Sequence, residues 1–175
     1  MAAKYFLRSE RLGFRLWNEQ DLALAIGLWG DPEVTRYIDS RPQLSEDDVS
    51  ALLNKQMAFQ CEHGIQYWPI FLLDDDEFAG CCGLRPYDQE QNILEFGVHL
   101  KPSRWGRGLG MEAGKAVIAY AFETLRVDAL FAGHNPRNEG SKRMLEKLGF
   151  VFTHYKFYPP TGLEHPSYLL RRGDG

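Results

Sequence analysis

The residues from Trp105 to Ala113, WGRGLGMEA, have the composition and spacing of a phosphate-binding turn. Three glycines alternate with other residues, a helical pattern follows them, and a strand-like run at 93–100 precedes them. A strand, a glycine turn and a helix N-terminus together present backbone N–H groups at the positive end of the helix dipole, which favours phosphate oxygens. Glycines also let the main chain approach a pyrophosphate closely and take a positive φ. The segment therefore predicts a phosphate site.

Two commoner phosphate motifs fit this segment poorly. A Walker loop ending at Gly114-Lys115 requires glycine at 109 and a hydroxyl residue at 116, where the chain has Leu109 and Ala116. A dinucleotide fingerprint can be aligned from Gly108 to Ala113, but it belongs in a first βα unit with an acidic residue about 20 residues further on. Here the segment lies past the middle of the chain. Nucleotide hydrolases and dehydrogenases are therefore disfavoured.

A second motif supports a family resemblance. It consists of Asn138-x-x-Ser141 followed by Leu145-Glu146-Lys147-Leu148-Gly149-Phe150. With Gly108-Leu109-Gly110, it resembles the GNAT superfamily of acetyl-CoA-dependent N-acetyltransferases. Trp105, in the place of the family's Arg or Gln, is similar to the branch that contains bacterial ribosomal-protein N-terminal (alanine) acetyltransferases. The opening Glu10-Arg11-Leu12-Gly13-Phe14-Arg15-Leu16 resembles the same branch, so the resemblance runs from about residue 9 to residue 170.

Hydrophobic periodicity predicts how these motifs are positioned. Strands are expected near 11–17, 65–73, 77–85, 93–100, 128–134, 151–158 and 167–171, and helices near 20–29, 45–63, 110–125 and 138–148. Early hairpin spacing and one βαβ-like passage favour a mixed, mainly antiparallel sheet. The resemblance implies the same α/β (α+β) fold, with a sheet of about 6–7 strands, about 4 helices, and a splay between the strands at 93–100 and 128–134. No linker divides the chain, so we expect a single GNAT-like domain over 1–175.

Composition is that of an ordinary globular protein. The chain has 175 residues, of which 44% are hydrophobic and 25% charged, and a net charge of −4. That charge gives no reason to bind nucleic acid or an anionic membrane. No apolar run spans a bilayer and the N-terminus lacks a secretory signal. Three cysteines, two of them adjacent, suggest no disulfide framework, so we expect a cytoplasmic protein with reduced thiols.

If the resemblance holds, amine acetylation needs a proton acceptor, donors for the thioester oxygen, and two oriented substrates. Glu95 is the candidate general base, acting directly or through water, because it is a carboxylate in an otherwise apolar strand and the family often has a glutamate on the matching strand. The alternative is a half-exposed polar residue on the second face of that strand. No metal is required, and the five histidines show no ligand spacing.

One departure from the family concerns the leaving thiolate. Many members have a tyrosine, the usual thiolate acid, seven residues after the motif asparagine, and here that position is Leu145. Ser141 is the nearby substitute, as a second catalytic candidate, because its hydroxyl can donate a proton. Ser141 and Asn138 could instead serve as helix-start residues, and Asn138 is expected to be the N-cap.

The resemblance also implies which residues contact acetyl-CoA. These are Val98, His99 and Leu100 beside pantetheine, Trp105, Gly106, Arg107, Gly108, Leu109, Gly110 and Met111 around the pyrophosphate, and Asn138 and Ser141 at the next helix.

The sequence as a whole predicts an N-acetyltransferase that transfers acetyl from acetyl-CoA to a primary amine directly in a ternary complex. A second interpretation is an acyl-CoA-binding or regulatory module with little catalysis, because the tyrosine is missing. A nucleotide-binding protein ranks third. The acceptor stays open among a protein N-terminus, an amino acid and an antibiotic amine, with specificity expected in the loops near 38–44 and 158–165. The sequence also leaves room for a homodimer.

Overall fold

The structure is a computed structural model that describes residues 4–174. Over this range the sheet has eight strands, in the order β1 (Leu7–Arg8), β2 (Leu12–Phe14), β3 (Tyr67–Leu72), β4 (Phe78–Asp88), β5 (Ile93–Leu100), β6 (Ala129–Gly133), β8 (Leu163–Arg171) and β7 (Val151–Tyr158). All neighbouring pairs are antiparallel except β5 with β6, which is parallel. This arrangement confirms the expected mixed, mostly antiparallel sheet.

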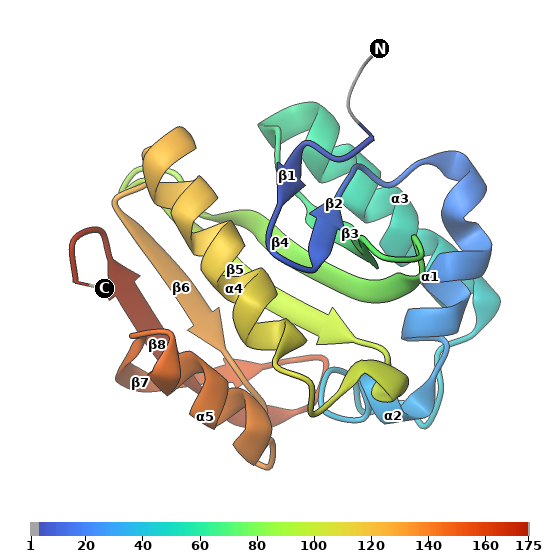
Figure 1. Ribbon diagram of the computed structural model, residues 1–175. Coiled ribbons are helices and arrows are strands. Elements are labelled where there is room, and N and C mark those ends of the chain that lie inside the picture. Colours follow the sequence, from blue (N-terminus) through green and yellow to red (C-terminus); the bar gives the residue numbers. More distant parts are fainter. Residues whose placement is uncertain (1–3, 175) are drawn as a thin grey trace.

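Five α-helices within residues 4–174 flank the sheet (Figure 1). They are α1 (Leu22–Trp29), α2 (Pro32–Thr35), α3 (Glu46–His63), α4 (Leu109–Ala119) and α5 (Glu139–Lys147). The α4 helix continues into a π-helical turn at Tyr120–Thr124, and 3₁₀ turns lie at Glu19–Asp21 and Pro102–Arg104. The sequence-based expectation of about four helices and six to seven strands missed α2 and β1. With four and two residues, these elements are too short to repeat a hydrophobic pattern that could be recognised.

Two hydrophobic layers sandwich the sheet. One contains residues of α4 and α5, including Val117 and Leu145, and the other contains residues of α1 and α3. Alternation along a strand assigns neighbours to opposite layers: Cys81 packs toward α1 and α3, whereas Cys82 packs toward α4. Both thiols are fully buried, and burial raises their pKa values, so they serve as small core residues as expected.

Local signals in the sequence fix several helix ends. Ser45 and Asp48 form a capping box at the start of α3, and Gly64 ends that helix with φ of 72°. Gly149 follows α5 with φ of 98°, which confirms it as the residue after the helix C-cap. Elsewhere β8 begins at Leu163, earlier than the expected start at 167, because Pro166 is accommodated where β8 has only β7 beside it.

The sheet splays apart between β5 and β6. The two strands pair only from Ile93–Ala129 to Glu95–Phe131, although β5 runs on to Leu100. The expected splay is therefore present, and it opens at the end of β5 that leads to the glycine segment. Figure 1 shows α4 and α5 on either side of this opening.

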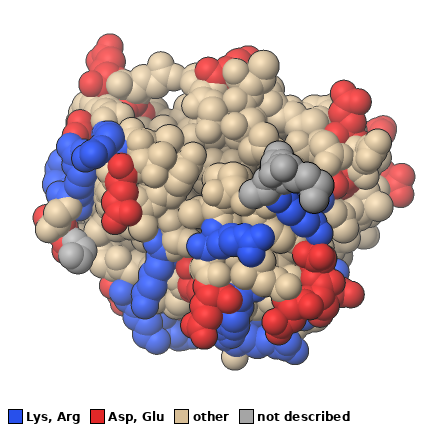
Figure 2. All heavy atoms as spheres, turned by 45° about the horizontal axis from the view of Figure 1, so that its top comes forward, with Lys and Arg blue, Asp and Glu red and all other residues tan. Residues whose placement is uncertain are grey.

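Charged side chains of both signs are interspersed on the face shown in Figure 2, in keeping with the modest net charge of −4. Within residues 4–174, no helix is both long and apolar enough to cross a membrane.

Candidate active site

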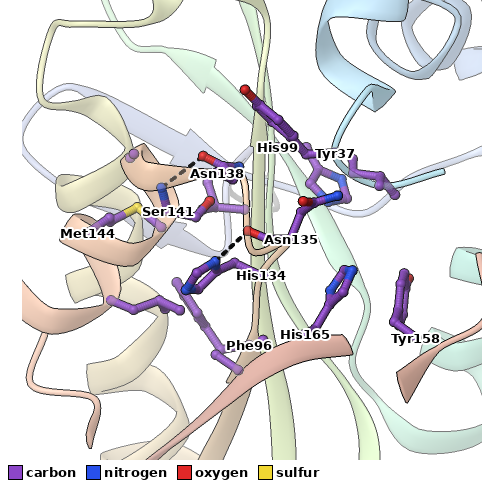
Figure 3. A pocket seen from close by; sticks show the side chains of 18 of the residues that line it. Tyr37, Phe96, His99, His134, Asn135, Asn138, Ser141, Met144, Tyr158 and His165 are labelled. Atoms are coloured by element: carbon purple, nitrogen blue, oxygen red, sulfur yellow. Dashed lines mark hydrogen bonds between the residues drawn. The ribbon is translucent and has the colours of Figure 1, made fainter. Parts of the chain in front are cut away.

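A cavity of about 850 Å³ lies at the splay. Its walls come from α2, the second half of β5, the glycine segment, the end of β6, the start of α5, and the β7–β8 hairpin. Figure 3 shows the labelled side chains around it, with Asn138 just before α5, Ser141 and Met144 on α5, and Tyr158 and His165 on the hairpin. The cavity therefore brings together residues more than one hundred positions apart in the sequence.

One end of the cavity is built from main chain. Gly106 and Gly108 take φ of 72° and 75°, and Gly108 is the N-cap of α4 without any side-chain cap. Among the residues described, no amide from Gly106 to Met111 donates a hydrogen bond to a protein acceptor. These donors lie at a helix N-terminus, where the dipole is positive. The segment thus has free donors at a helix N-terminus, and phosphate binding there stays a prediction.

The glycine segment is held in place by the N-terminal part of the chain. Arg11 Nε lies 2.7 Å from Glu112 Oε1, and the Arg11 amide donates to Glu112 Oε2 at 2.8 Å. Arg11 Nη1 also donates to the Arg107 carbonyl at 3.0 Å, and the Ser9 hydroxyl donates to Glu112. Burial acts to raise the pKa of Glu112, but the hydrogen bonds from Ser9 and Arg11 outweigh it and lower that pKa. We call this set the Arg11–Glu112 brace.

The second half of β5 presents its even-numbered main-chain groups to the splay. The Asn92 carbonyl accepts from Asp128 on the β6 side, whereas the Lys101 amide donates to Ala79 on the β4 side. The main-chain groups of successive residues in a strand point to opposite neighbours. Those of Val98 and Leu100 therefore point toward the opening, and those of His99 point toward β4. His99 therefore reaches the cavity with its side chain.

Trp105 lies beside the end of this strand. Its indole donates to the Leu100 carbonyl at 3.0 Å, and the residue is 46% exposed. Trp105, Gly106, Gly110 and Met111 line the cavity. Three other members of the predicted segment do not: Arg107 is exposed, Gly108 shapes the turn, and Leu109 is buried in the core.

At the opposite end lies Glu95, whose side chain is 18% exposed. Its Oε2 accepts from Arg85 Nε and from the Tyr67 hydroxyl, the latter at 3.3 Å. Its Oε1 has no hydrogen-bond partner among the described residues and is not enclosed by protein. One carboxylate oxygen is thus anchored while the other faces the cavity.

Tyr67 occupies the space above Gly97 in β5. A Cβ at Gly97 would lie 2.4 Å from the Tyr67 hydroxyl, so only glycine admits this ring. The ring meets Glu95 through its hydroxyl and packs edge-on against His99 at a centroid distance of 5.6 Å. Burial raises the pKa of Tyr67 far above its ordinary value, which keeps the hydroxyl protonated as a donor.

His99 is held by the first helix. Trp29 Nε1 donates to His99 Nδ1 at 3.1 Å, and Cys81 Sγ lies 3.9 Å from the same nitrogen. Burial, followed by the charge of Arg85, lowers the pKa of His99 to about 4. The imidazole is therefore neutral at physiological pH. Trp29 itself is buried, as expected for a packing tryptophan, as are Trp17 and Trp68.

The start of α5 forms the wall opposite β5. Asn138 is the N-cap, as expected, and its side chain accepts from the Ser141 amide at 3.1 Å. Both residues and Leu145 line the cavity. Leu145 is 3% exposed and offers no proton donor, so Ser141 supplies the hydroxyl on this part of the helix.

A histidine on the β6–α5 connection shapes the same wall. His134 Nδ1 lies 2.7 Å from the Asn135 carbonyl, and Nε2 lies 3.1 Å from the Tyr168 hydroxyl (Figure 3 shows the first contact). Because a carbonyl can only accept, Nδ1 carries the proton and Nε2 accepts from Tyr168. Burial lowers the pKa of His134, which favours the neutral ring. The hydrogen bond between His134 and Tyr168 supports the turn that leads into Asn138.

Sequence reasoning missed the side chains that surround Glu95 and His99. Arg85, Tyr67 and Trp29 come from β4, β3 and α1, and no local spacing links them to β5. Gly97 was the one available signal, since a glycine inside a strand often marks a close approach by another group.

Comparisons with known proteins agree with this geometry. The acetyltransferase (GNAT) domain family matches residues 11–151. The uncharacterized N-acetyltransferase p20 of Bacillus licheniformis is 30% identical over 144 residues, which cover 82% of this chain and 81% of that protein. Among solved structures, the spermidine N-acetyltransferase of Vibrio cholerae, in complex with CoA and spermine, superposes with a TM-score of 0.78 at 17% identity, covering 94% of this chain and 97% of that one.

A ribosomal L7/L12 alpha-N-protein acetyltransferase in complex with coenzyme A has a TM-score of 0.79 at 14% identity and covers 93% of this chain and 95% of its own. At these identities the two structures show the common fold. The family match spans most of the chain and includes both the glycine segment and the start of α5. The chain therefore belongs to the GNAT family of acetyltransferases.

Proposed function

We propose that this acetyltransferase moves an acetyl group from acetyl-CoA to a primary amine, by direct transfer while both substrates are bound. The observation that carries the proposal is the run of amides from Gly106 to Met111 that have no partner within residues 4–174, at one end of a cavity whose other end holds Glu95. An anion site and a proton acceptor, joined by an open strand edge, are what this reaction requires.

The residues present fit coenzyme A. The pyrophosphate would accept hydrogen bonds from the amides of the glycine segment, which positive φ at Gly106 and Gly108 orients. The pantetheine arm carries amide groups of its own. The main-chain groups of Val98 and the amide of Leu100, which do not pair with β6, match them. The thioester would then lie between β5 and Ser141, since both line the cavity.

Glu95 is the proposed proton acceptor. Its free Oε1 would take a proton from the amine, directly or through one water, as the amine nitrogen attacks the thioester carbon. Arg85 and Tyr67 hold the other oxygen and so fix the direction of the carboxylate. The C–S bond breaks as the C–N bond forms, and CoA leaves as a thiolate.

Ser141 is the proposed donor to that thiolate, because Leu145 has no hydroxyl. The Ser141 amide is fixed by Asn138, which orients the first turn of α5 at the cavity wall. A serine is a weak acid, so its contribution is a hydrogen bond to sulfur or the relay of a proton from water.

The test combines CoA binding by calorimetry with CoA thiol release over a library of amines and peptides. Release with at least one amine, dependent on acetyl-CoA, is the expected result. CoA binding without release on any amine would instead identify an acyl-CoA-binding module, which the loss of the tyrosine permits. Stronger competition by ATP than by CoA would identify a nucleotide-binding protein.

A further inference from the structure

The hydrogen bond from Trp29 determines which ring nitrogen of His99 carries the proton. An indole N–H can only donate, so the bond from Trp29 Nε1 to His99 Nδ1 requires a lone pair on Nδ1. A neutral imidazole with a lone pair on Nδ1 carries its proton on Nε2. The histidine is thus fixed as the Nε2–H tautomer by a buried tryptophan on another element.

That N–H belongs to a residue of the cavity wall. His99 lines the cavity, and its Nε2 makes no hydrogen bond with any residue in the described range 4–174. Nor is this atom enclosed by protein. The groups that surround the ring are Trp29, Cys81 and Tyr67, with Arg85 and Glu95 beyond them. The protein therefore presents one oriented, neutral donor to whatever enters.

The donor lies on the acceptor side of β5. His99 shares its face of the strand with Glu95 and with the Tyr67 ring, toward α1 and α2, whereas Phe96 belongs to the layer under α4. The anion site lies at the N-terminus of α4. An amine that reaches Glu95 without crossing the coenzyme must pass along the face that carries His99.

We propose that His99 Nε2–H donates a hydrogen bond to an oxygen of the acceptor beside the reacting amine. The preferred acceptors are then amines with a neighbouring carbonyl or hydroxyl oxygen, such as amino-acid amides and peptide N-termini, over simple alkylamines and polyamines. This inference rests on the proposed N-acetyltransferase function, because it names the acceptor class of the same site.

The selectivity follows from what each amine offers to the donor. A protonated polyamine presents N–H donors, and its one neutral nitrogen must use its lone pair to attack the thioester. Such a substrate leaves the His99 donor desolvated and unpaired. An unpaired buried donor costs about 1–3 kcal/mol, which corresponds to roughly 5- to 150-fold in kcat/KM.

The first experiment observes the tautomer without any reaction. Nitrogen NMR of histidine-labelled protein should show His99 as the neutral Nε2–H form between about pH 5 and 8, the range in which ordinary histidines titrate. Trp29→Phe should allow the Nδ1–H form to appear. A His99 that is cationic at pH 7, or already Nδ1–H in the wild type, overturns the inference.

The second experiment compares alaninamide with isopropylamine, which lacks the carbonyl. The ratio of their kcat/KM values should favour alaninamide and should fall by roughly 5-fold or more in His99→Phe, since the ring remains and the donor is lost. Taking the change in this ratio between variants cancels the different basicities of the two amines. His99→Gln, which can accept from Trp29 and donate to the cavity, should recover part of the preference.

His63→Phe is the matched control, because His63 is exposed at the end of α3 and should leave the ratio unchanged. An unchanged ratio in His99→Phe overturns the acceptor inference alone, since acetylation itself persists. Thiol release with no amine at all overturns the proposed function, and the acceptor inference with it.

Discussion

The two ends of the cavity are built in opposite ways. The proposed anion end is made of consecutive main-chain amides on one turn, and its shape follows from glycines at 106 and 108. The acceptor end is made of side chains from β3, β4, β5 and α1, which meet only after the sheet has formed. CoA affinity should therefore be lost when a backbone angle changes at the first end. Turnover should be lost when a single side-chain atom is replaced at the second end.

The largest expected effect is at the anion end. Gly108→Val places a β-branched residue at φ of 75°, which disfavours the turn and blocks close approach of a phosphate. We expect CoA affinity to fall by at least 10²-fold, since lost charge-assisted hydrogen bonds and strain of this kind each cost about 1–3 kcal/mol. Calorimetry measures the affinity, and circular dichroism checks the fold.

Gly64→Val is the matched control for that variant. Gly64 has φ of 72°, and no atom of the described residues lies within 4 Å of the position of a Cβ there, so the backbone strain is similar and lies at the end of α3. It should lower the melting temperature without changing CoA affinity. Equal loss of affinity in the two variants would show that strain alone, rather than the glycine segment, governs binding.

At the acceptor end, Glu95→Gln keeps the shape of the side chain and removes the proposed proton acceptor. Turnover should fall by roughly 10²-fold below the pKa of the amine and recover in part as the pH is raised, because more amine is then neutral. Steady-state rates across pH measure the effect. Exposed Glu123→Gln serves as the control. If Glu95→Gln kept full activity at every pH, the role of Glu95 would be structural and water would serve as the base.

A smaller effect is expected from Ser141→Ala. CoA affinity should stay near that of the wild type, while turnover falls by about 10-fold through slower departure of the thiolate. The defect should shrink with an acyl donor whose thiol is a better leaving group. A defect of equal size with both donors would contradict a role at sulfur.

The smallest effect concerns the Arg11–Glu112 brace. Glu112→Gln weakens its bonds to Arg11, and we expect a loss of about 1 kcal/mol or less in stability, because Arg11 is 46% exposed. The pKa of Glu112 is lowered, so its contribution is present above the ordinary glutamate pKa and is lost as pH falls through the lowered value. The stability gap between variant and wild type, from urea unfolding, should therefore close in acid. A gap independent of pH would exclude the ion pair as its cause.

The contrast between the two ends also sets what could be predicted from the sequence. The glycine segment, the N-cap at Asn138 and the bounds of β5 and β7 follow from local residue order, and the structure agrees with them. Local order also distinguishes the two faces of β5, since Glu95 and His99 fall on the face opposite Phe96.

The partners of Glu95 and His99 could not be predicted in this way. Tyr67 and Arg85 contact Glu95 only because β3, β4 and β5 pair in one register, and register depends on the whole sheet. Short elements were missed for a similar reason. The four residues of α2 are too few to show a helical period, yet they line the cavity.

The three-residue ladder between β5 and β6 has a consequence for the stability of the sheet. Strands β1 to β5 form one half of the sheet, and β6, β8 and β7 form the other. Beyond Glu95 the main-chain groups of β5 do not pair with those of β6. A pantetheine arm bonded to Val98 and Leu100 would act as the missing strand. Bound coenzyme should then slow amide hydrogen exchange at that junction and protect the enzyme from proteolysis, so that its lifetime tracks the supply of acetyl-CoA.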